Sequence, residues 1–211
     1  SQTSLYNDFW HVLGALEAAL GHLVDWPDAE HRRRLADTMP ALEGCIGLVD
    51  ATELYVTAPG TTAGRHNTFS GKARTHTVMM QVVVDPYGNI INIDGGVGGR
   101  INDIALWRRT DVGEAAAWQQ GRGWFSAGEY LVGDCGYGGC SRILMPYRDS
   151  EMSSSSVKGR ARRVFSNLIR RYRAVNEYIF GVIKARYKMV GGTISVSKRK
   201  VPLLFKAAAL L

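Results

Sequence analysis

Apolar side chains in the first forty residues recur at a helical spacing. The leucines that carry this pattern are Leu13, Leu16, Leu20 and Leu23. Steps of three and four residues place them on one face of a helix. The segment Trp26-Pro27-Asp28 interrupts the pattern, with Asp25 or Asp28 as a candidate N-cap and Pro27 in the first turn of a second helix. This second helix is expected to run through residues 31–35 towards Pro40.

From residue 44 onwards the apolar pattern is typical of strands. Residues 44–56 (GCIGLVDATELYV) begin with a short apolar run and then alternate, which predicts a first strand. A segment rich in Gly, Thr and Pro, residues 58–67, is expected to be a loop. Residues 75–84 (THTVMMQVVV) and 89–94 (NIINID) predict two further strands joined by a turn at 85–88. Together these three strands are expected to form a β-meander.

The remaining elements complete an α/β pattern. A helix is expected around residues 103–109 and a short strand at 130–132. The serine-rich stretch 150–157 predicts a mobile loop, and residues 163–189 predict one long basic amphipathic helix. The apolar tail 203–211 is expected to be a helix or strand without its partner. Three adjacent strands, a helix, another strand and a final helix fit an RNase H-like mixed sheet flanked by helices.

Composition and charge narrow the class of protein. The chain has 211 residues, which is enough for one α/β domain. There are 26 basic against 19 acidic residues, a net charge of +7, which favours a nucleic-acid partner. No apolar run approaches the roughly 20 residues that span a bilayer, and residues 1–10 lack a signal-peptide pattern. An intracellular protein with no membrane partner is therefore expected.

The three cysteines do not suggest a disulfide framework. Cys45, Cys135 and Cys140 cannot all pair within one chain, and they lie among apolar and glycine residues. We expect reduced thiols. The alternative is that Cys135 and Cys140 form half of a structural zinc site, but no second pair of ligands follows at the required spacing.

Two aspartates stand at the ends of apolar strands. Asp50 follows residues 46–49 (IGLV) and Asp134 follows residues 131–133 (LVG). Burying a carboxylate costs several kcal/mol unless it is compensated, and Mg²⁺ prefers such hard oxygen ligands. A third acid, Glu177, lies on the basic helix. The alternative is that the aspartates are turn or cap residues and that Glu177 makes a surface ion pair worth less than about 1 kcal/mol.

Five segments in order resemble the DDE superfamily endonuclease domain of Harbinger (PIF-like) transposases and related insertion-sequence transposases. They are residues 45–54 (CIGLVDATEL), 69–92 (FSGKARTHTVMMQVVVDPYGNIIN), 98–107 (GGRINDIALW), 131–137 (LVGDCGY, with LMPY following at 144–147) and 167–187 (NLIRRYRAVNEYIFGVIKARY). The first resembles the family's I-D-G-T-H strand, with Ala51 in place of Gly and Glu53 in place of His. The last resembles the helix in which an arginine precedes the catalytic glutamate, followed by F-G-x-x-K. The resemblance covers roughly residues 26–190.

This resemblance implies a site, an activity and partners. Asp50, Asp134 and Glu177 would be the catalytic, metal-binding triad. Asp103 would be an accessory acid near the metals, with a helix N-cap as its alternative role. Two Mg²⁺ or Mn²⁺ ions would support cutting, and also joining, of DNA strands. Residues 1–40 would form a helical segment and 41–211 the catalytic domain.

The implied partners are DNA (transposon ends and target), a Myb-like DNA-binding protein and further copies of the chain, in the nucleus if the host is eukaryotic. Two alternatives remain at this stage. One is a domesticated, catalytically silent DNA-binding or adaptor protein. The other is an RNase H-like nuclease that acts on RNA or hybrids.

Basic residues cluster before Glu177 and beside the meander. The candidates for binding phosphates are Lys72, Arg74, Lys158, Arg160, Arg162, Arg163, Arg170, Arg173 and Lys184. Such contacts would position DNA without reading its sequence. The alternative for the helical members is a solvated helix face.

Overall fold

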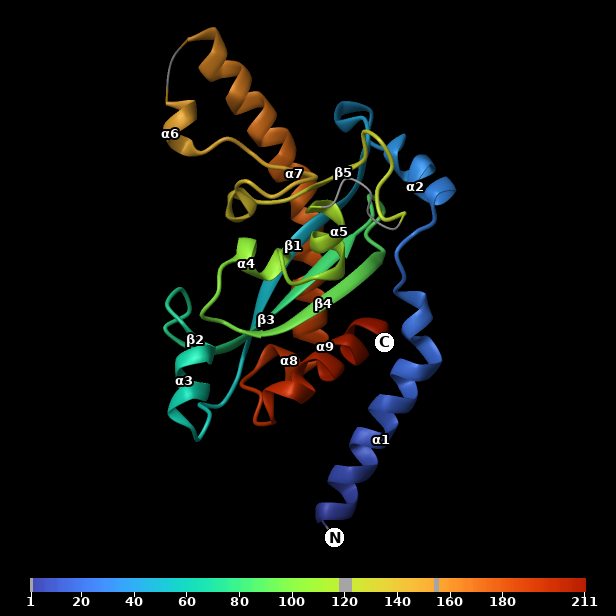
Figure 1. Ribbon diagram of the computed structural model, residues 1–211, viewed down its shortest axis with the longest axis vertical. Coiled ribbons are helices and arrows are strands. Elements are labelled where there is room, and N and C mark those ends of the chain that lie inside the picture. The colour runs from blue at the N-terminus through green and yellow to red at the C-terminus, as the bar shows by residue number, and fades with distance from the viewer. Residues whose placement is uncertain (1, 118–122, 154–155) are drawn as a thin grey trace.

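A six-stranded mixed sheet forms the centre of the computed structural model, which describes residues 2–117, 123–153 and 156–211 (Figure 1). The strands are β1 (Cys45–Tyr55), β2 (Phe69–Ser70), β3 (Thr75–Val84), β4 (Ile90–Gly98), β5 (Tyr130–Val132) and β6 (Ile143–Leu144). Strand β3 pairs antiparallel with β1, β2 and β4. Strand β5 runs parallel to β1, and β6 runs parallel to β5. This topology confirms the predicted RNase H-like α/β fold.

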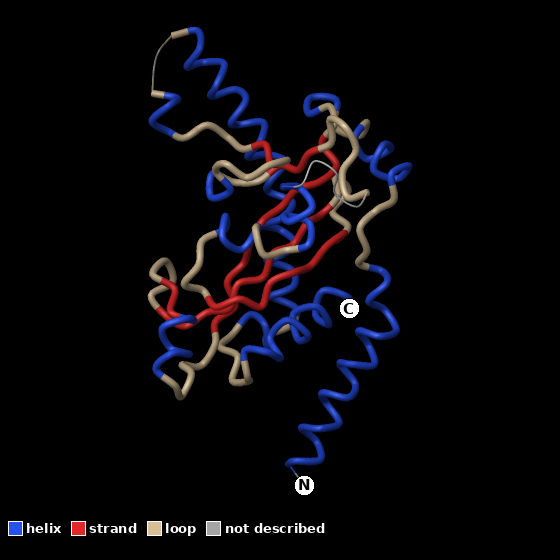
Figure 2. The backbone as a smooth tube through the Cα atoms, viewed as in Figure 1, coloured by secondary structure: helices blue, strands red, loops and turns tan. Residues whose placement is uncertain are grey.

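Helices cover both faces of the sheet (Figures 1 and 2). The α-helices are α1 (Gln2–Leu20), α2 (Ala29–Ala36), α3 (Thr62–Thr68), α4 (Asp103–Trp107), α5 (Asp111–Ala117), α6 (Asp149–Met152), α7 (Val157–Arg186), α8 (Lys188–Gly191) and α9 (Val201–Leu210). Short 3-10 turns are η1 (Gly21–Leu23), η2 (Pro40–Leu42), η3 (Cys135–Tyr137) and η4 (Lys198–Lys200). No helix in the described ranges is long and apolar enough to cross a membrane.

Two apolar cores lie on opposite faces of β1, because successive residues of a strand point to opposite sides. An irregularity between Cys45 and Gly47 interrupts this alternation, so that Ile46 shares a face with Val49. Leu48 and Leu54 pack with α7 and α9 in one core. Ile46 and Val49 pack with Trp107 of α4 in the other. Strand β1 is therefore covered on both faces, which explains why its sequence opens with a continuous apolar run rather than strict alternation.

Local capping explains where the helices differ from the sequence predictions. Asp28 accepts a hydrogen bond from the His31 amide at 2.8 Å and caps α2, so Pro27 precedes the cap and is not in the first turn. Residues 58–67 were expected to be a loop. They contain most of α3, because Thr61 caps it through the Gly64 amide. Helix α5 was not predicted.

The long helix and the tail also differ from expectation. Helix α7 begins six residues before the predicted start, where Ser156 accepts a hydrogen bond from the Gly159 amide at 3.2 Å. Part of the predicted serine-rich loop forms α6, and residues 154–155 lie outside the described ranges. The tail forms α9, and its partner is α1, which packs along it. The expectation that the tail lacks a partner was therefore wrong.

The N-terminal segment is fastened to the loop that precedes β5. The Trp26 Nε1 group donates to the Trp124 carbonyl oxygen at 2.7 Å. Arg32 and Glu129 form an ion pair at 2.8 Å, with side chains only 3% and 7% exposed. Arg32 also donates to the Pro27 carbonyl oxygen at 2.7 Å. Both residues are thus buried together with their hydrogen bonds satisfied.

Candidate active site

Strand pairing brings Asp50, in the middle of β1, next to Asp134, which follows the C-terminal end of β5. Strands β1 and β5 are parallel, and Leu48 lies opposite Val132. Each aspartate stands two residues further along its chain, so the two side chains emerge next to each other. The negative charge of Asp134 contributes to raising the pKa of Asp50, which shows that the two carboxylates lie within electrostatic range.

Asp103 joins the two aspartates from α4. A Cβ atom added to Gly136 would collide with carboxylate oxygens of both Asp103 and Asp134, so these two side chains converge on that glycine. Burial, and next the charge of Asp134, raise the pKa of Asp103. The N-cap of α4 is Asn102, which accepts from the Ala105 amide at 2.9 Å. Asp103 is therefore not the capping residue.

The side chain of Asp50 is 15% exposed and is paired with Arg173 of α7. The Arg173 Nη2 atom lies 3.3 Å from Asp50 Oδ2. Burial raises the pKa of Asp50 to about 6, although the Arg173 guanidinium opposes this shift. One ion pair thus compensates only part of the cost of burying this carboxylate.

A buried phenol beside the three aspartates was not identified from the sequence. Tyr137 is fully buried, and its hydroxyl has no hydrogen-bond partner among the described residues. Burial raises the pKa of Tyr137, and the next causes are the charges of Asp50, Asp103 and Asp134. The hydroxyl therefore lies within electrostatic range of all three carboxylates. Its only signal in the sequence is its position three residues after Asp134.

Glu177 lies on the same face of α7 as the two residues that contact β1. It follows Arg173 by one turn and precedes Lys184 by two turns. The side chain is exposed, and within the described ranges no hydrogen bond or ion pair joins it to the aspartates. The described residues accordingly contain no ready-made group of three metal-ligating side chains.

Lys184 anchors α7 to the middle of β1. Its Nζ atom lies 2.6 Å from Thr52 Oγ1 and 3.0 Å from the Glu53 carbonyl oxygen. Burial lowers the pKa of this amine. With Arg173 on Asp50, Lys184 fixes the helix at two points, and Glu177 lies between them along the helix.

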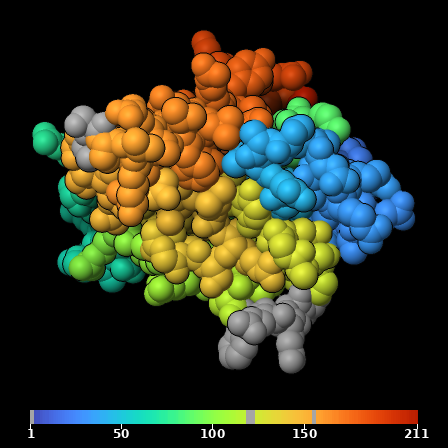
Figure 3. Space-filling view, turned by 90° about the horizontal axis from the view of Figure 1, so that it is seen from above, coloured from blue at the N-terminus to red at the C-terminus, as the bar shows by residue number. Residues whose placement is uncertain are grey.

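Several of the arginines named as DNA-binding candidates hold α6 against the N-terminal half of α7. Arg162 and Arg163 donate to carbonyl oxygens of Glu151 and Met152 at 3.0 and 2.6 Å. Arg170 pairs with Asp149 at 3.0 Å. These contacts build an arm that projects beyond the sheet in Figure 1 and lies beside the loops of residues 130–150 in Figure 3.

Other candidates for binding phosphate are exposed. They are Lys72, Arg74, Lys158 and Arg160. The cysteines are free thiols, and burial raises the pKa of Cys45 to about 11.

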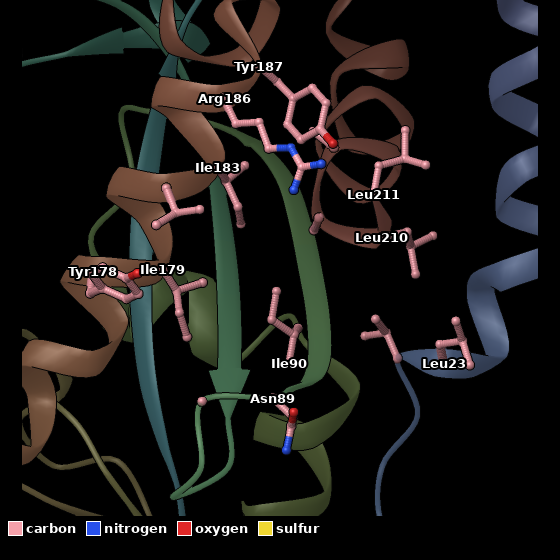
Figure 4. Close-up of a pocket in the computed structure, with 15 residues that line it drawn as sticks. Leu23, Asn89, Ile90, Tyr178, Ile179, Ile183, Arg186, Tyr187, Leu210 and Leu211 are labelled. Atoms are coloured by element: carbon pink, nitrogen blue, oxygen red, sulfur yellow. The ribbon is translucent and has the colours of Figure 1, made fainter.

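Two hollows differ sharply in chemistry. One, of about 390 Å³, lies between α7 and α9 and is lined mostly by apolar side chains such as Ile179, Ile183 and Leu210 (Figure 4). No carboxylate lines it. The other, of about 610 Å³, is polar and reaches Asp103 and Glu53. Of these two hollows, the polar one reaches the acid cluster, at Asp103.

Comparison with known proteins agrees with this geometry. The family model described as DDE superfamily endonuclease matches residues 49–211, a range that contains Asp50, Asp103, Asp134 and Glu177. The Arabidopsis thaliana protein Antagonist of like heterochromatin protein 1 is 21% identical over 225 residues, covering all of this chain and 54% of that protein. The Arabidopsis thaliana protein ALP1-like is 21% identical over 197 residues, covering 83% of this chain and 48% of that protein.

The chain thus spans about half the length of the curated relatives it matches. No solved structure matches it. With the family model covering most of the chain, the protein belongs to the DDE superfamily endonuclease family.

Proposed function

We propose that this protein is a divalent-metal-dependent DNA endonuclease of the transposase type, which cuts DNA strands and joins the freed 3′-hydroxyl to target DNA at the same site. The observation that carries the proposal is the convergence of Asp50, Asp103 and Asp134 beside the C-terminal end of β5, next to the helix that bears Glu177. Residues 41–211 would carry the catalytic domain and residues 1–40 its helical attachment.

The residues present fit divalent metal ions. Mg²⁺ is usually held by one or two carboxylates together with water and phosphate oxygens, so a preformed cage of three ligands is not required. Asp50 is buried with a raised pKa, a cost that a bound cation would offset. Tyr137 offers an additional hydroxyl without a partner among the described side chains.

Asp50 and Asp134 would hold two Mg²⁺ or Mn²⁺ ions, with Asp103 beside them and Glu177 completing one ion's ligands. When bound, such ions activate the attacking oxygen and stabilise the departing one.

The other side chains would position the substrate and the helix. Arg173 is paired with Asp50. It would turn to a DNA phosphate once a cation takes its place, since a guanidinium binds phosphate as well as carboxylate. Lys184 would keep α7 in register with β1 so that Glu177 stays above the aspartates.

The pH dependence follows from the raised pKa of Asp50. A carboxyl whose folded pKa lies above its unfolded value stabilises the folded state at low pH, and this contribution is lost as the pH rises through about 6. Metal binding requires the deprotonated form, so Mn²⁺ affinity should fall up to about tenfold per pH unit below 6.

We expect Mn²⁺ to raise the unfolding temperature at pH 7.5 and to have little effect at pH 5. Thermal unfolding in EDTA and in Mn²⁺ at both pH values measures this. An Mn²⁺ shift of equal size at both pH values would contradict the role given to Asp50.

Tyr137→Phe should separate folding from metal binding. Removing a hydroxyl that lacks a partner costs little stability, so the unfolding temperature in EDTA should be unchanged or slightly higher. Mn²⁺ affinity should fall by about tenfold or more, as expected when a group that supports metal ligands is lost. Titration of Mn²⁺ followed by electron paramagnetic resonance measures this affinity. Tyr130→Phe, at the other end of β5, is the control, and equal Mn²⁺ affinities for both variants would refute the role of Tyr137.

A silent DNA-binding or adaptor protein is the second candidate. Two observations favour it: Arg173 already occupies Asp50, and no three-ligand cluster is preassembled in the described part of the chain. The name of one relative describes antagonism towards a heterochromatin protein. A similar role here would make a chromatin protein the partner, in the nucleus. This second candidate function predicts salt-sensitive DNA binding without any shift of the unfolding temperature by Mn²⁺.

The substrate class is tested by comparing labelled DNA, RNA and hybrid duplexes of one sequence in Mg²⁺ or Mn²⁺. We expect cleavage of DNA, and a preference for the hybrid would overturn the transposase assignment.

Adding a Myb-like DNA-binding partner, or raising the protein concentration to favour oligomers, should increase DNA cleavage if the active form is a larger assembly.

A further inference from the structure

The polar cleft beside the aspartates is built from three parts of the chain. Its floor comes from alternate residues of β1, namely Ala51, Glu53 and Tyr55, with Met79 of β3 beside them. One wall is the turn at residues 70–73 and the other is the segment 99–103, which ends at Asp103. Lys184 of α7 reaches the cleft as well. The cleft therefore extends from the acid cluster along the C-terminal half of β1, towards Tyr55.

Two cations of this cleft have no partner within the described ranges. The side chains of Lys72 and Arg100 are exposed and make no hydrogen bond or ion pair there. Lys72 nevertheless lies within electrostatic range of Asp103, because its charge lowers the pKa of that carboxyl. In contrast, Arg162, Arg163 and Arg170 are engaged in contacts along the α6–α7 arm. The cleft thus offers free positive charge close to the aspartates.

The cleft also offers an aromatic surface. Tyr55 is 45% exposed, and its ring makes no aromatic contact or hydrogen bond in the described part of the structure. An exposed aromatic ring beside free cations is the arrangement on which single-stranded nucleic acids bind, with bases on the ring and phosphates on the cations. A volume of about 610 Å³ is that of a small-ligand site, too small for a double helix.

We propose that this cleft binds one unpaired nucleotide next to the cleaved phosphate, with its base stacked on Tyr55 and its phosphate on Lys72 and Arg100. This inference rests on the proposed function, because it places the nucleotide relative to the metal-binding aspartates. Beyond the proposed function, the inference requires that one DNA strand separates from the duplex at the active site. The strand then runs from Asp103 towards Tyr55.

The probe is an eight-nucleotide dT strand with one central 2-aminopurine, a base whose fluorescence falls when it stacks on an aromatic ring. Binding is measured in Ca²⁺ at several salt concentrations. Tyr55→Ala should weaken binding by about tenfold and abolish the fall in fluorescence, whereas Tyr55→Phe should behave as the native protein. Tyr87→Ala removes an even more accessible ring, 73% exposed against 45% for Tyr55, from the β3–β4 turn and is the control.

The cations are tested by the salt dependence of the same binding. Because both cations are placed on one phosphate, the double variant Lys72→Ala with Arg100→Ala should reduce the slope of log affinity against log salt by about 0.7, the contribution of one phosphate contact to a single strand. Arg33→Ala on α2 removes an exposed cation elsewhere and should leave the slope unchanged.

The outcomes separate this inference from the proposed function. If the native protein cuts duplex DNA but Tyr55→Ala binds the probe with native affinity and native fluorescence, the cleft assignment is wrong and the function stands. If the native protein neither cuts DNA nor binds the probe, both are wrong. Probe binding that depends on Tyr55 in a protein that cuts no DNA would support the cleft and overturn the endonuclease.

Discussion

Glu177→Gln should reduce DNA cleavage by about a thousandfold or more, because a metal ligand would be lost where charge develops during strand cutting. DNA affinity should remain within about twofold of native, since phosphate contacts dominate affinity and Glu177 makes none of them. The side chain is exposed and without a partner in the described structure, so the substitution should not change stability. Cleavage rate, DNA affinity and unfolding temperature measured on the same preparation check all three expectations.

Glu114→Gln is the matched control, because Glu114 is exposed on α5 and lies outside the proposed site. It should cut DNA at the native rate. If Glu177→Gln also cuts at the native rate, the third ligand has been assigned to the wrong residue. The aspartates would then have to be tested without it.

Glu129→Ala should destabilise the folded protein by about 3–5 kcal/mol, because it leaves the guanidinium of Arg32 buried without its partner. This is a large part of the roughly 5–15 kcal/mol that stabilises a typical domain. Urea unfolding measures the change. Glu30→Ala breaks the exposed ion pair with Arg34 and should cost less than about 1 kcal/mol.

The double variant Arg32→Met with Glu129→Leu removes both buried charges and should recover most of the loss. Its recovery would show that the penalty comes from an unpaired charge rather than from lost packing. A loss for Glu129→Ala no larger than that for Glu30→Ala would mean that residues 26–36 are not fastened to the catalytic domain through this pair.

The longer strands and β5 were predictable because each carries a strong local signal, whereas the two-residue strands β2 and β6 were not predicted. Strands β1, β3 and β5 lie where apolar and β-branched runs predicted them. Helices α3 and α5 are short, and their sequences are rich in small or polar residues that carry no apolar period. The pairing of α9 with α1 joins opposite ends of the chain, and no local pattern predicts such a contact.

In the candidate site, too, residues with a local sequence signal were predicted, and contacts between distant parts of the chain were not. The aspartates were found because each follows a short apolar run. Asp134 does follow the end of a strand, whereas Asp50 lies in the middle of β1, and the parallel register of β1 and β5 explains why they meet. The pairing of Arg173 with Asp50 spans more than one hundred residues, so the sequence placed this arginine among the DNA-binding candidates but did not reveal its contact with Asp50. Tyr137 was missed because nothing in its local sequence shows that its ring is buried beside the carboxylates. Only its buried, unpartnered hydroxyl marks it.

The most direct test of the metal-dependent site is cleavage of a labelled DNA duplex in Mg²⁺ or Mn²⁺, with EDTA and with Asp134→Asn as controls. Asp134 is the aspartate that lies within electrostatic range of both Asp50 and Asp103. The account predicts cutting by the native protein with metal, and none in EDTA or by Asp134→Asn. Cutting that persists in EDTA, or in Asp134→Asn at the native rate, would contradict it.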